Sequence, residues 1–191
     1  MALPEPEFPS EERLIAAVLE GDDGAFAALV GIHKRRVLRI AARFSRTPGE
    51  LEELGQEIFL KAYADLGKYR GEAPLSHWLS RIAVRSCYDA LRKRRREIGT
   101  SPLEDAAPYL ADESVDDRIR AESARALLDR ALSRLRPADR LVITLLELEE
   151  RTVREVSGLT GWSEVNVKVR AYRARRALKR VLEEEDDGKR G

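Results

Sequence analysis

The chain has 191 residues, of which 36% are charged and 43% hydrophobic, and its formal net charge is +1. That length allows one medium domain or two small ones, and that balance indicates a folded, helix-rich protein. The single cysteine, Cys87, excludes an internal disulfide framework, and neither a signal pattern nor an apolar run near about 18 residues is present. We therefore expect a cytoplasmic protein that is neither exported nor inserted in a membrane.

The residues that enzymes need are scarce. The chain has two histidines, His33 and His77, no phosphate-binding loop and no metal-ligand spacing. We therefore expect a protein that is not an enzyme, with no catalytic residue, no cofactor and no metal.

Charge alternates along the chain. Residues 70–96 hold eight basic residues against two acids, residues 97–117 hold seven acids and no base, and residues 164–182 are basic again. This alternation favours two DNA-facing patches joined by an acidic strap. Surface charge that serves only solubility is the alternative.

The first elements are predicted to be helices. A proline-rich tail at 1–9 precedes Ser10, which can cap a helix that ends at Gly21. Asp22 or Asp23 starts the next helix. His33 falls in its series of apolar residues, and we interpret it as a structural or surface histidine.

The order of the elements predicted in 51–96 is the most informative feature of the chain. After the start signal Thr47-Pro48, an acidic amphipathic helix precedes a glycine-punctuated loop at 67–71. A second helix then buries an apolar face, presents Trp78 outward, and ends in the basic run 92–96. No useful length of the chain alternates with period two, so the fold class is predicted to be all-α.

The C-terminal half contains a predicted helix-turn-helix. Proline and acidic residues make 98–116 a linker, and two further helices precede Thr152. Thr152 and Glu155 form a capping box, Gly161 makes a turn, and Ser163 caps a long basic helix. Such a second helix fits the DNA major groove with its early residues at the base edges.

Three blocks in order resemble domain two of a known family. They are E-L-G-Q-E-I-F at 53–59, Y-R-G-E-A-P-L-S-H-W-L-S-R-I-A at 69–83 and D-A-L-R-K at 89–93. The motif L-R-P-A-D-R at 135–140 resembles the segment that precedes the helix-turn-helix of domain four. From about residue 11 to 182, the chain therefore resembles an extracytoplasmic-function (ECF, group IV) RNA polymerase sigma factor, the small promoter-recognition subunit of bacterial RNA polymerase.

The resemblance implies a domain organisation. Sigma domain two would occupy 10–97 and sigma domain four 117–185, joined by a flexible acidic linker at 98–116 and flanked by flexible tails at 1–9 and 186–191. The linker would run through the RNA exit and active-site channel of polymerase, although a plain flexible spacer has the same composition.

The resemblance assigns the minus-35 element to the helix after Ser163. Lys168 and Arg173 can donate to guanine or phosphate, Asn166 can bond adenine or support the helix start, and Val169 can contact a thymine methyl group. Phosphate contact and solvated charge both stay open for Arg170 and Arg176. The implied minus-35 residues are Asn166, Lys168, Val169, Arg170, Tyr172, Arg173 and Arg176.

The resemblance assigns the minus-10 element to the loop at 67–74 and the helix after it. The loop would capture one flipped non-template base, aromatic rings would stack on bases, and arginines would hold phosphates. A tryptophan at this helical spacing is also typical of a core, and the basic run is also typical of a solvated helix end. The implied minus-10 residues are Tyr69, Arg70, Gly71, His77, Trp78, Arg81, Arg85, Arg92 and Lys93.

The resemblance also implies protein partners. Core RNA polymerase would offer the clamp helices of its beta-prime subunit to the acidic helix, and the flap of its beta subunit as a second contact. Gly55, in that helix, would allow a close approach. An anti-sigma factor is a further implied partner, and the protein would associate with the nucleoid in the holoenzyme. The implied core-binding residues are Glu52, Glu53, Gln56 and Glu57.

The function that the resemblance implies is a promoter-specificity factor that binds core RNA polymerase, recognises the minus-35 and minus-10 elements and promotes DNA melting and transcription initiation. Such a factor uses both halves of the chain. Two alternatives remain beside this leading hypothesis. An autonomous helix-turn-helix regulator would bind duplex DNA without polymerase and leaves the pattern at 51–96 unused. An adaptor that contacts only proteins explains the acidic faces and leaves the basic ones unused.

Overall fold

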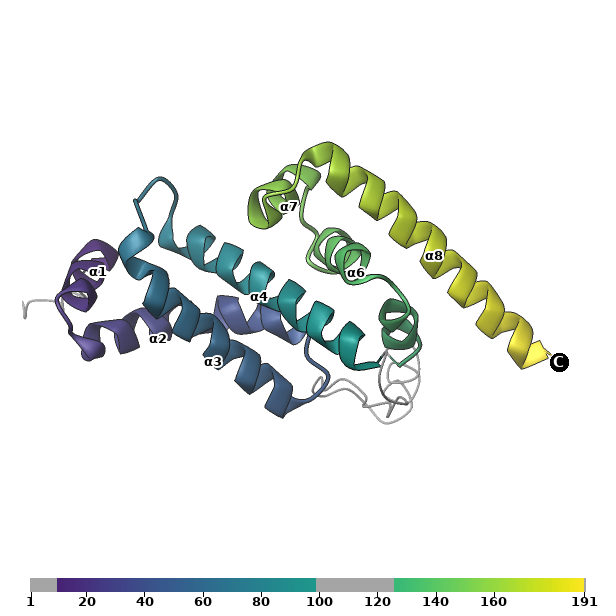
Figure 1. Cartoon of the computed structure of the whole chain (residues 1–191), viewed down its shortest axis with the longest axis horizontal. Helices are drawn as coiled ribbons and strands as arrows, with labels where there is room; N and C mark the ends of the chain where they lie inside the picture. Colours follow the sequence, from purple (N-terminus) through teal and green to yellow (C-terminus); the bar gives the residue numbers. More distant parts are fainter. Residues whose placement is uncertain (1–9, 99–125, 191) are drawn as a thin grey trace, which may run out of the picture.

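The computed structural model describes residues 10–98 and 126–190, and within these residues every regular element is a helix (Figure 1). The all-α prediction is therefore confirmed. The tail at 1–9, the linker from 99 to 116 and the predicted start of domain four at 117 lie outside the described residues. The N-terminal elements are α1 (Glu11–Leu19), α2 (Asp23–Ala42), α3 (Pro48–Asp65), the 3₁₀ turn η1 (Leu66–Lys68) and α4 (Leu75–Ile98). After helical residues 126–133, the C-terminal elements are α6 (Pro137–Ile143), the π-helical turn η2 (Thr144–Leu148), α7 (Val153–Thr160) and α8 (Glu164–Arg190).

The helix starts follow the predicted caps. The side chains of Ser10, Asp22 and Thr47 each accept a hydrogen bond from the backbone N–H three residues on. Such a bond satisfies one of the N–H groups that a helix start leaves unpaired. The local sequence therefore determines where α1, α2 and α3 begin.

Helix α2 is the centre of the N-terminal half, because α1, α3 and α4 all pack on it. Its Val37 is fully buried, together with Ile58 of α3 and Cys87 of α4. A Cβ atom on Gly55 would lie 2.6 Å from Leu38 Cδ2, so the missing side chain of this glycine lets α3 approach α2. The close approach that we expected at Gly55 is therefore made inside the domain.

Two buried side chains of this half have structural roles. His33 is buried on α2, and its Nε2 lies 3.1 Å from Glu11 Oε1 on α1, which confirms a structural histidine. Burial raises the pKa of the Cys87 thiol. Cys87 is therefore a small apolar core residue without a reactive thiolate.

The C-terminal half contains the predicted helix-turn-helix. Thr152 and Glu155 form the capping box of α7, Gly161 adopts the left-handed conformation with φ of 75°, and Ser163 accepts from the backbone N–H of Asn166. Two boundaries differ from expectation. The second of the helices expected before Thr152 begins at Pro137 and changes to π-helical winding at Thr144. Helix α8 continues to Arg190, through residues 186–190 of the predicted tail.

The two halves form one packed body. Helix α4 packs against α6 and α7, and α6 lies between α4 and α8 (Figure 1). A continuous cluster of buried residues includes Val37 and Val84 from the first half and Leu141, Val156 and Val167 from the second. The two predicted domains therefore pack together.

Candidate functional site

The loop before α4 is braced from within. Tyr69 donates its hydroxyl to the backbone oxygen of Ala73 over 2.7 Å, and its ring lies 5.5 Å from the ring of Trp78. Gly71 has a positive φ of 72°, which a residue with a side chain rarely adopts. Tyr69 and Trp78 are both half-buried against the core, whereas Arg70 and Gly71 are exposed. The loop therefore exposes its backbone and Arg70 to solvent, and the ring pair of Tyr69 and Trp78 packs beneath it.

Helix α4 carries a stripe of basic residues that starts next to Trp78. At 3.6 residues per turn, Trp78, Arg81, Arg85 and Arg92 fall on one side of the helix, and the three arginines are exposed. Lys93 is exposed on a neighbouring line. The stripe is thus a row of cations suited to the phosphates of a nucleic-acid strand.

One residue of the basic run faces inward. Arg94 donates to the backbone oxygen of Phe44 over 3.2 Å and pairs with Glu50 Oε2 at 2.9 Å. Burial lowers the pKa of its guanidinium, while the Glu50 carboxylate opposes that shift. Arg94 therefore connects α4 to the end of α2 and the start of α3, a role that the sequence did not indicate.

Helix α3 presents an acidic face that ends at an exposed leucine. Glu52, Glu53, Gln56 and Glu57 are all exposed, as the sequence predicts. Leu60 follows Gln56 and Glu57 by one helical turn and is 70% exposed. An exposed apolar side chain beside charged ones is typical of a protein-binding surface.

Helix α8 presents the other basic face. Five of its seven predicted minus-35 residues are exposed. The other two, Asn166 and Arg170, are half-buried and bond to each other, with Arg170 Nε donating to Asn166 Oδ1 over 2.7 Å. The five exposed residues are Lys168, Val169, Tyr172, Arg173 and Arg176.

Arg170 is held by three parts of the chain. Besides its bond to Asn166, its guanidinium lies 4.5 Å above the centre of the Trp162 ring and 3.7 Å from Asp139 Oδ1 on α6. Asp139 is buried and also pairs with Arg136 at 2.9 Å. This network attaches the first turns of α8 to the turn before it and to α6.

A groove of about 520 Å³ lies beside the exposed face of α8. The predicted residues Tyr172, Arg173 and Arg176 line it together with three arginines that we did not predict. The sequence signal for these three was only their positive charge, since they come from two separate segments. The additional arginines are Arg134, Arg136 and Arg180.

Aromatic and ionic contacts hold the junction between the two halves. The rings of Tyr88 on α4 and Trp162 contact edge to face, with centres 5.4 Å apart. Arg43, at the end of α2, donates to Glu149 over 2.7 Å and to the backbone oxygen of Leu148 over 3.3 Å. Burial, reinforced by the charge of Arg94, lowers the pKa of Arg140 at this junction to about 10.

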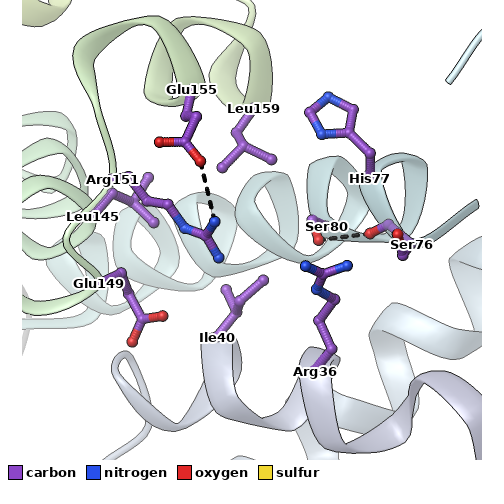
Figure 2. Close-up of a pocket in the computed structure, with 10 residues that line it drawn as sticks. All are labelled: Arg36, Ile40, Ser76, His77, Ser80, Leu145, Glu149, Arg151, Glu155 and Leu159. Atoms are coloured by element: carbon purple, nitrogen blue, oxygen red, sulfur yellow. Dashed lines mark hydrogen bonds and ion pairs between the residues drawn. The ribbon is translucent and has the colours of Figure 1, made fainter. Parts of the chain in front are cut away.

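A pocket of about 210 Å³ opens between the halves (Figure 2). His77 and Ser80 of α4 line one side, and Glu155 and Leu159 of α7 line the opposite side. His77, a predicted minus-10 residue, therefore lies across this pocket from the helix-turn-helix. The side chains of Glu155 and Arg151 bond to each other on the far wall (Figure 2).

Two kinds of site are absent from the part of the chain that the structure describes. Within residues 10–98 and 126–190, no group of three histidine, cysteine, aspartate or glutamate residues could hold a metal ion. Over the same residues, no helix combines the length and the apolarity needed to cross a bilayer.

Comparison with known proteins gives consistent matches in both halves. Sigma-70 region 2 matches residues 29–97, and Sigma-70 region 4 matches residues 125–178. The chain is 34% identical to the ECF RNA polymerase sigma factor SigM of Mycobacterium tuberculosis, over 91% of this chain and 85% of that protein. It is 29% identical to the RNA polymerase sigma-H factor of Pseudomonas aeruginosa, over 91% of this chain and 94% of that protein. The fold is similar to that of the sigma factor RpoE of Bartonella quintana, solved with the anti-sigma factor NepR. The TM-score is 0.59 at 24% identity, and the match covers 83% of this chain and 96% of that one.

Proposed function

Because this chain belongs to the ECF RNA polymerase sigma factors, which are promoter-recognising transcription initiation factors, we propose a role for each of its three surfaces. The acidic face of α3 docks on core RNA polymerase, the loop and stripe of α4 hold the minus-10 element, and α8 enters the major groove of the minus-35 element. The observation that carries this proposal is that one chain presents two separate basic surfaces, on α4 and on α8, together with an acidic face on α3.

The minus-10 surface suits an opened strand. The exposed loop around Gly71 offers backbone amides to a flipped base, and the half-buried pair of Tyr69 and Trp78 forms a firm floor. Arg81 and Arg85 continue from that floor along α4 and hold the phosphates of the strand. Because Tyr69 is tied to Ala73, the loop keeps its shape before DNA arrives, which lowers the ordering cost of binding.

The face of α3 suits a protein partner. Leu60 is 70% exposed and lies one helical turn after Gln56 and Glu57 and two turns after Glu53. A cationic partner surface with an apolar pocket would cover Leu60 and pair with Glu53 and Glu57. We assign this contact to the clamp helices of the beta-prime subunit and propose the beta flap as the contact of the C-terminal half.

Engagement of both promoter elements requires the halves to separate. The minus-35 and minus-10 elements lie about 25 base pairs apart, which is about 85 Å of duplex. In the structure, His77 and the helix-turn-helix line one pocket of about 210 Å³. Residues 99–125 could span at most about 90 Å when fully extended, which is enough for the open state. The packed structure is therefore the closed form of a protein that opens on the promoter.

The remaining assignments follow from the same role. Group IV membership, a cytoplasmic location and association with the nucleoid in the holoenzyme fit a factor that works on the bacterial chromosome. The chemistry of RNA synthesis stays with polymerase, and this chain acts as a non-enzymatic subunit. An anti-sigma factor is the proposed negative regulator, since the similar sigma factor RpoE is bound to the anti-sigma factor NepR.

Reversal of charge on α3 tests the core contact. Glu53→Lys with Glu57→Lys is expected to weaken binding to purified core polymerase by at least about tenfold, because rim charges would then repel a cationic partner. Glu12→Lys with Glu20→Lys makes the same charge change at an exposed position of α1 and at the exposed residue that follows it, and serves as the matched control. Equal core affinity of both folded double variants would refute the assignment of the α3 face.

A further inference from the structure

An exposed apolar stripe runs along the first turns of α8. Val165 is 71% exposed, Val169 42% and Tyr172 60%. At 3.6 residues per turn these three side chains lie on one line of the helix, opposite the buried Val167 and Ala171. None of the three belongs to a core cluster, and the exposed part of each side chain is available to a ligand.

The polar residue beside the stripe is already engaged. Recognition of adenine by asparagine uses both atoms of the amide at once. The Oδ1 atom of Asn166 accepts from Arg170 over 2.7 Å, and Trp162 and Asp139 hold Arg170 in place. Asn166 is thus directed toward its own chain, and the first two turns of α8 offer valines to the base edges.

The surroundings of the stripe select its ligand. Lys168 flanks it on one side and Arg173 on the other, and an arginine-lined groove of about 520 Å³ lies alongside. These cations suit the phosphates that border a DNA groove. When phosphates lie on the flanks, the stripe faces the floor of the major groove, where the C5-methyl of thymine is the apolar group.

We infer that Val165 and Val169 recognise thymine methyl groups in the minus-35 element. The two valines lie about 6 Å apart along the helix axis, which spans about two base-pair steps. They would therefore select A·T pairs at two nearby positions, while Lys168 and Arg173 contact guanine or phosphate. Arg170 is a positioning residue in this account. The inference rests on the proposed binding of α8 to the minus-35 element.

Replacement of thymine by deoxyuridine tests the inference, because it removes the methyl group and keeps the base pair. A promoter identified by run-off transcription with the holoenzyme is resynthesised with deoxyuridine at one thymine of the minus-35 element at a time. At two positions we expect transcription at limiting holoenzyme to fall about fourfold, since burial of one methyl-sized group contributes about 0.8 kcal/mol. Val165→Ser should abolish this loss at one position and Val169→Ser at the other. Lys168→Ala should lower transcription from both templates and leave their ratio unchanged.

Each outcome bears on a different claim. Equal use of thymine and deoxyuridine templates at every position, with transcription still dependent on the minus-35 element, would overturn the methyl contact alone. A deoxyuridine effect that persists in both valine variants would assign it to DNA shape and also overturn the contact. Transcription that does not depend on the element would overturn the proposed role of α8 and this inference together.

Discussion

The contacts between the two halves should control how readily this protein engages a promoter. Tyr88→Ala removes an aromatic ring from the junction. The centre of this ring lies 5.4 Å from the centre of the Trp162 ring, and the two rings contact edge to face. Glu149→Gln removes the charge that accepts from Arg43 over 2.7 Å, and its side chain is only 6% exposed. Glu149 lies outside both DNA surfaces, so this second variant changes the junction without altering a nucleic-acid contact.

The structure sets the size of each effect. An edge-to-face aromatic pair contributes about 1 kcal/mol beyond its burial, and the half-buried Tyr88 ring adds about 1 kcal/mol of apolar contact. A loss of about 2 kcal/mol shifts the balance between closed and open forms about 30-fold toward the open form. Glu149→Gln keeps the shape and loses the charge, which should cost about 1 kcal/mol and shift the balance about fivefold.

Run-off transcription at fixed core polymerase measures this shift. When the competent form is a minor population, the apparent dissociation constant rises in inverse proportion to its fraction. The concentration for half-maximal transcription should therefore fall, by up to about 30-fold in Tyr88→Ala and about fivefold in Glu149→Gln. Ile32→Ala, at an exposed position of α2, should leave it unchanged. An unchanged or higher concentration in both folded junction variants would refute the claim that opening precedes promoter engagement.

Three further predictions test single surfaces. Leu60→Asp should weaken binding to core polymerase by about tenfold, because it replaces the exposed apolar side chain of the docking face with a charge. Core affinity equal to that of the natural protein would contradict this. Arg173→Ala should lower transcription about tenfold from promoters with an intact minus-35 element and leave promoters without it unaffected, and an equal effect on both would argue against a base contact. The backbone hydrogen bond from Thr152 lowers the pKa of Glu155 in the folded protein. A carboxylate with a lowered pKa stabilises the fold at pH values above its pKa in the unfolded chain. This stabilisation is lost as the pH falls through its pKa in the folded protein. Glu155→Ala should therefore lower the free energy of unfolding by about 0.5 kcal/mol at pH 7, a low value because the carboxylate is 46% exposed and screened by solvent. The difference between the two proteins in urea unfolding should vanish in acid. A difference that does not depend on pH would count against the capping role.

The sequence predicted what depends on neighbours along the chain. Ser10, Asp22 and Thr47 cap helices because a cap bonds to a backbone group three residues away, and Gly161 makes the turn because glycine adopts a positive φ at little cost. The exposed acidic face of α3 and the exposed arginines of α4 follow from helical periodicity in the same way. Such features can be predicted because they depend only on residues within one or two helical turns of each other.

The features that the sequence did not predict join distant residues. Arg43 and Glu149 are 106 positions apart, and no local pattern of charge distinguishes them from solvated residues. Arg94 was one of five consecutive basic residues, and only the packing of α4 against α2 and α3 turns it inward. Arg170 became a positioning residue because Trp162 and Asp139 meet around it. The residue-level assignments to the minus-10 and minus-35 elements remain predictions.

Run-off transcription on a pool of promoter fragments, with purified core polymerase and with or without this protein, is the most direct test of the central claim. If the protein is a promoter-specificity factor, new discrete start sites should require it, preceded by two shared elements at the minus-35 and minus-10 positions. Start sites that are the same with and without the folded protein, combined with tight binding of the protein alone to duplex DNA in a gel shift, would contradict it and identify an autonomous regulator instead.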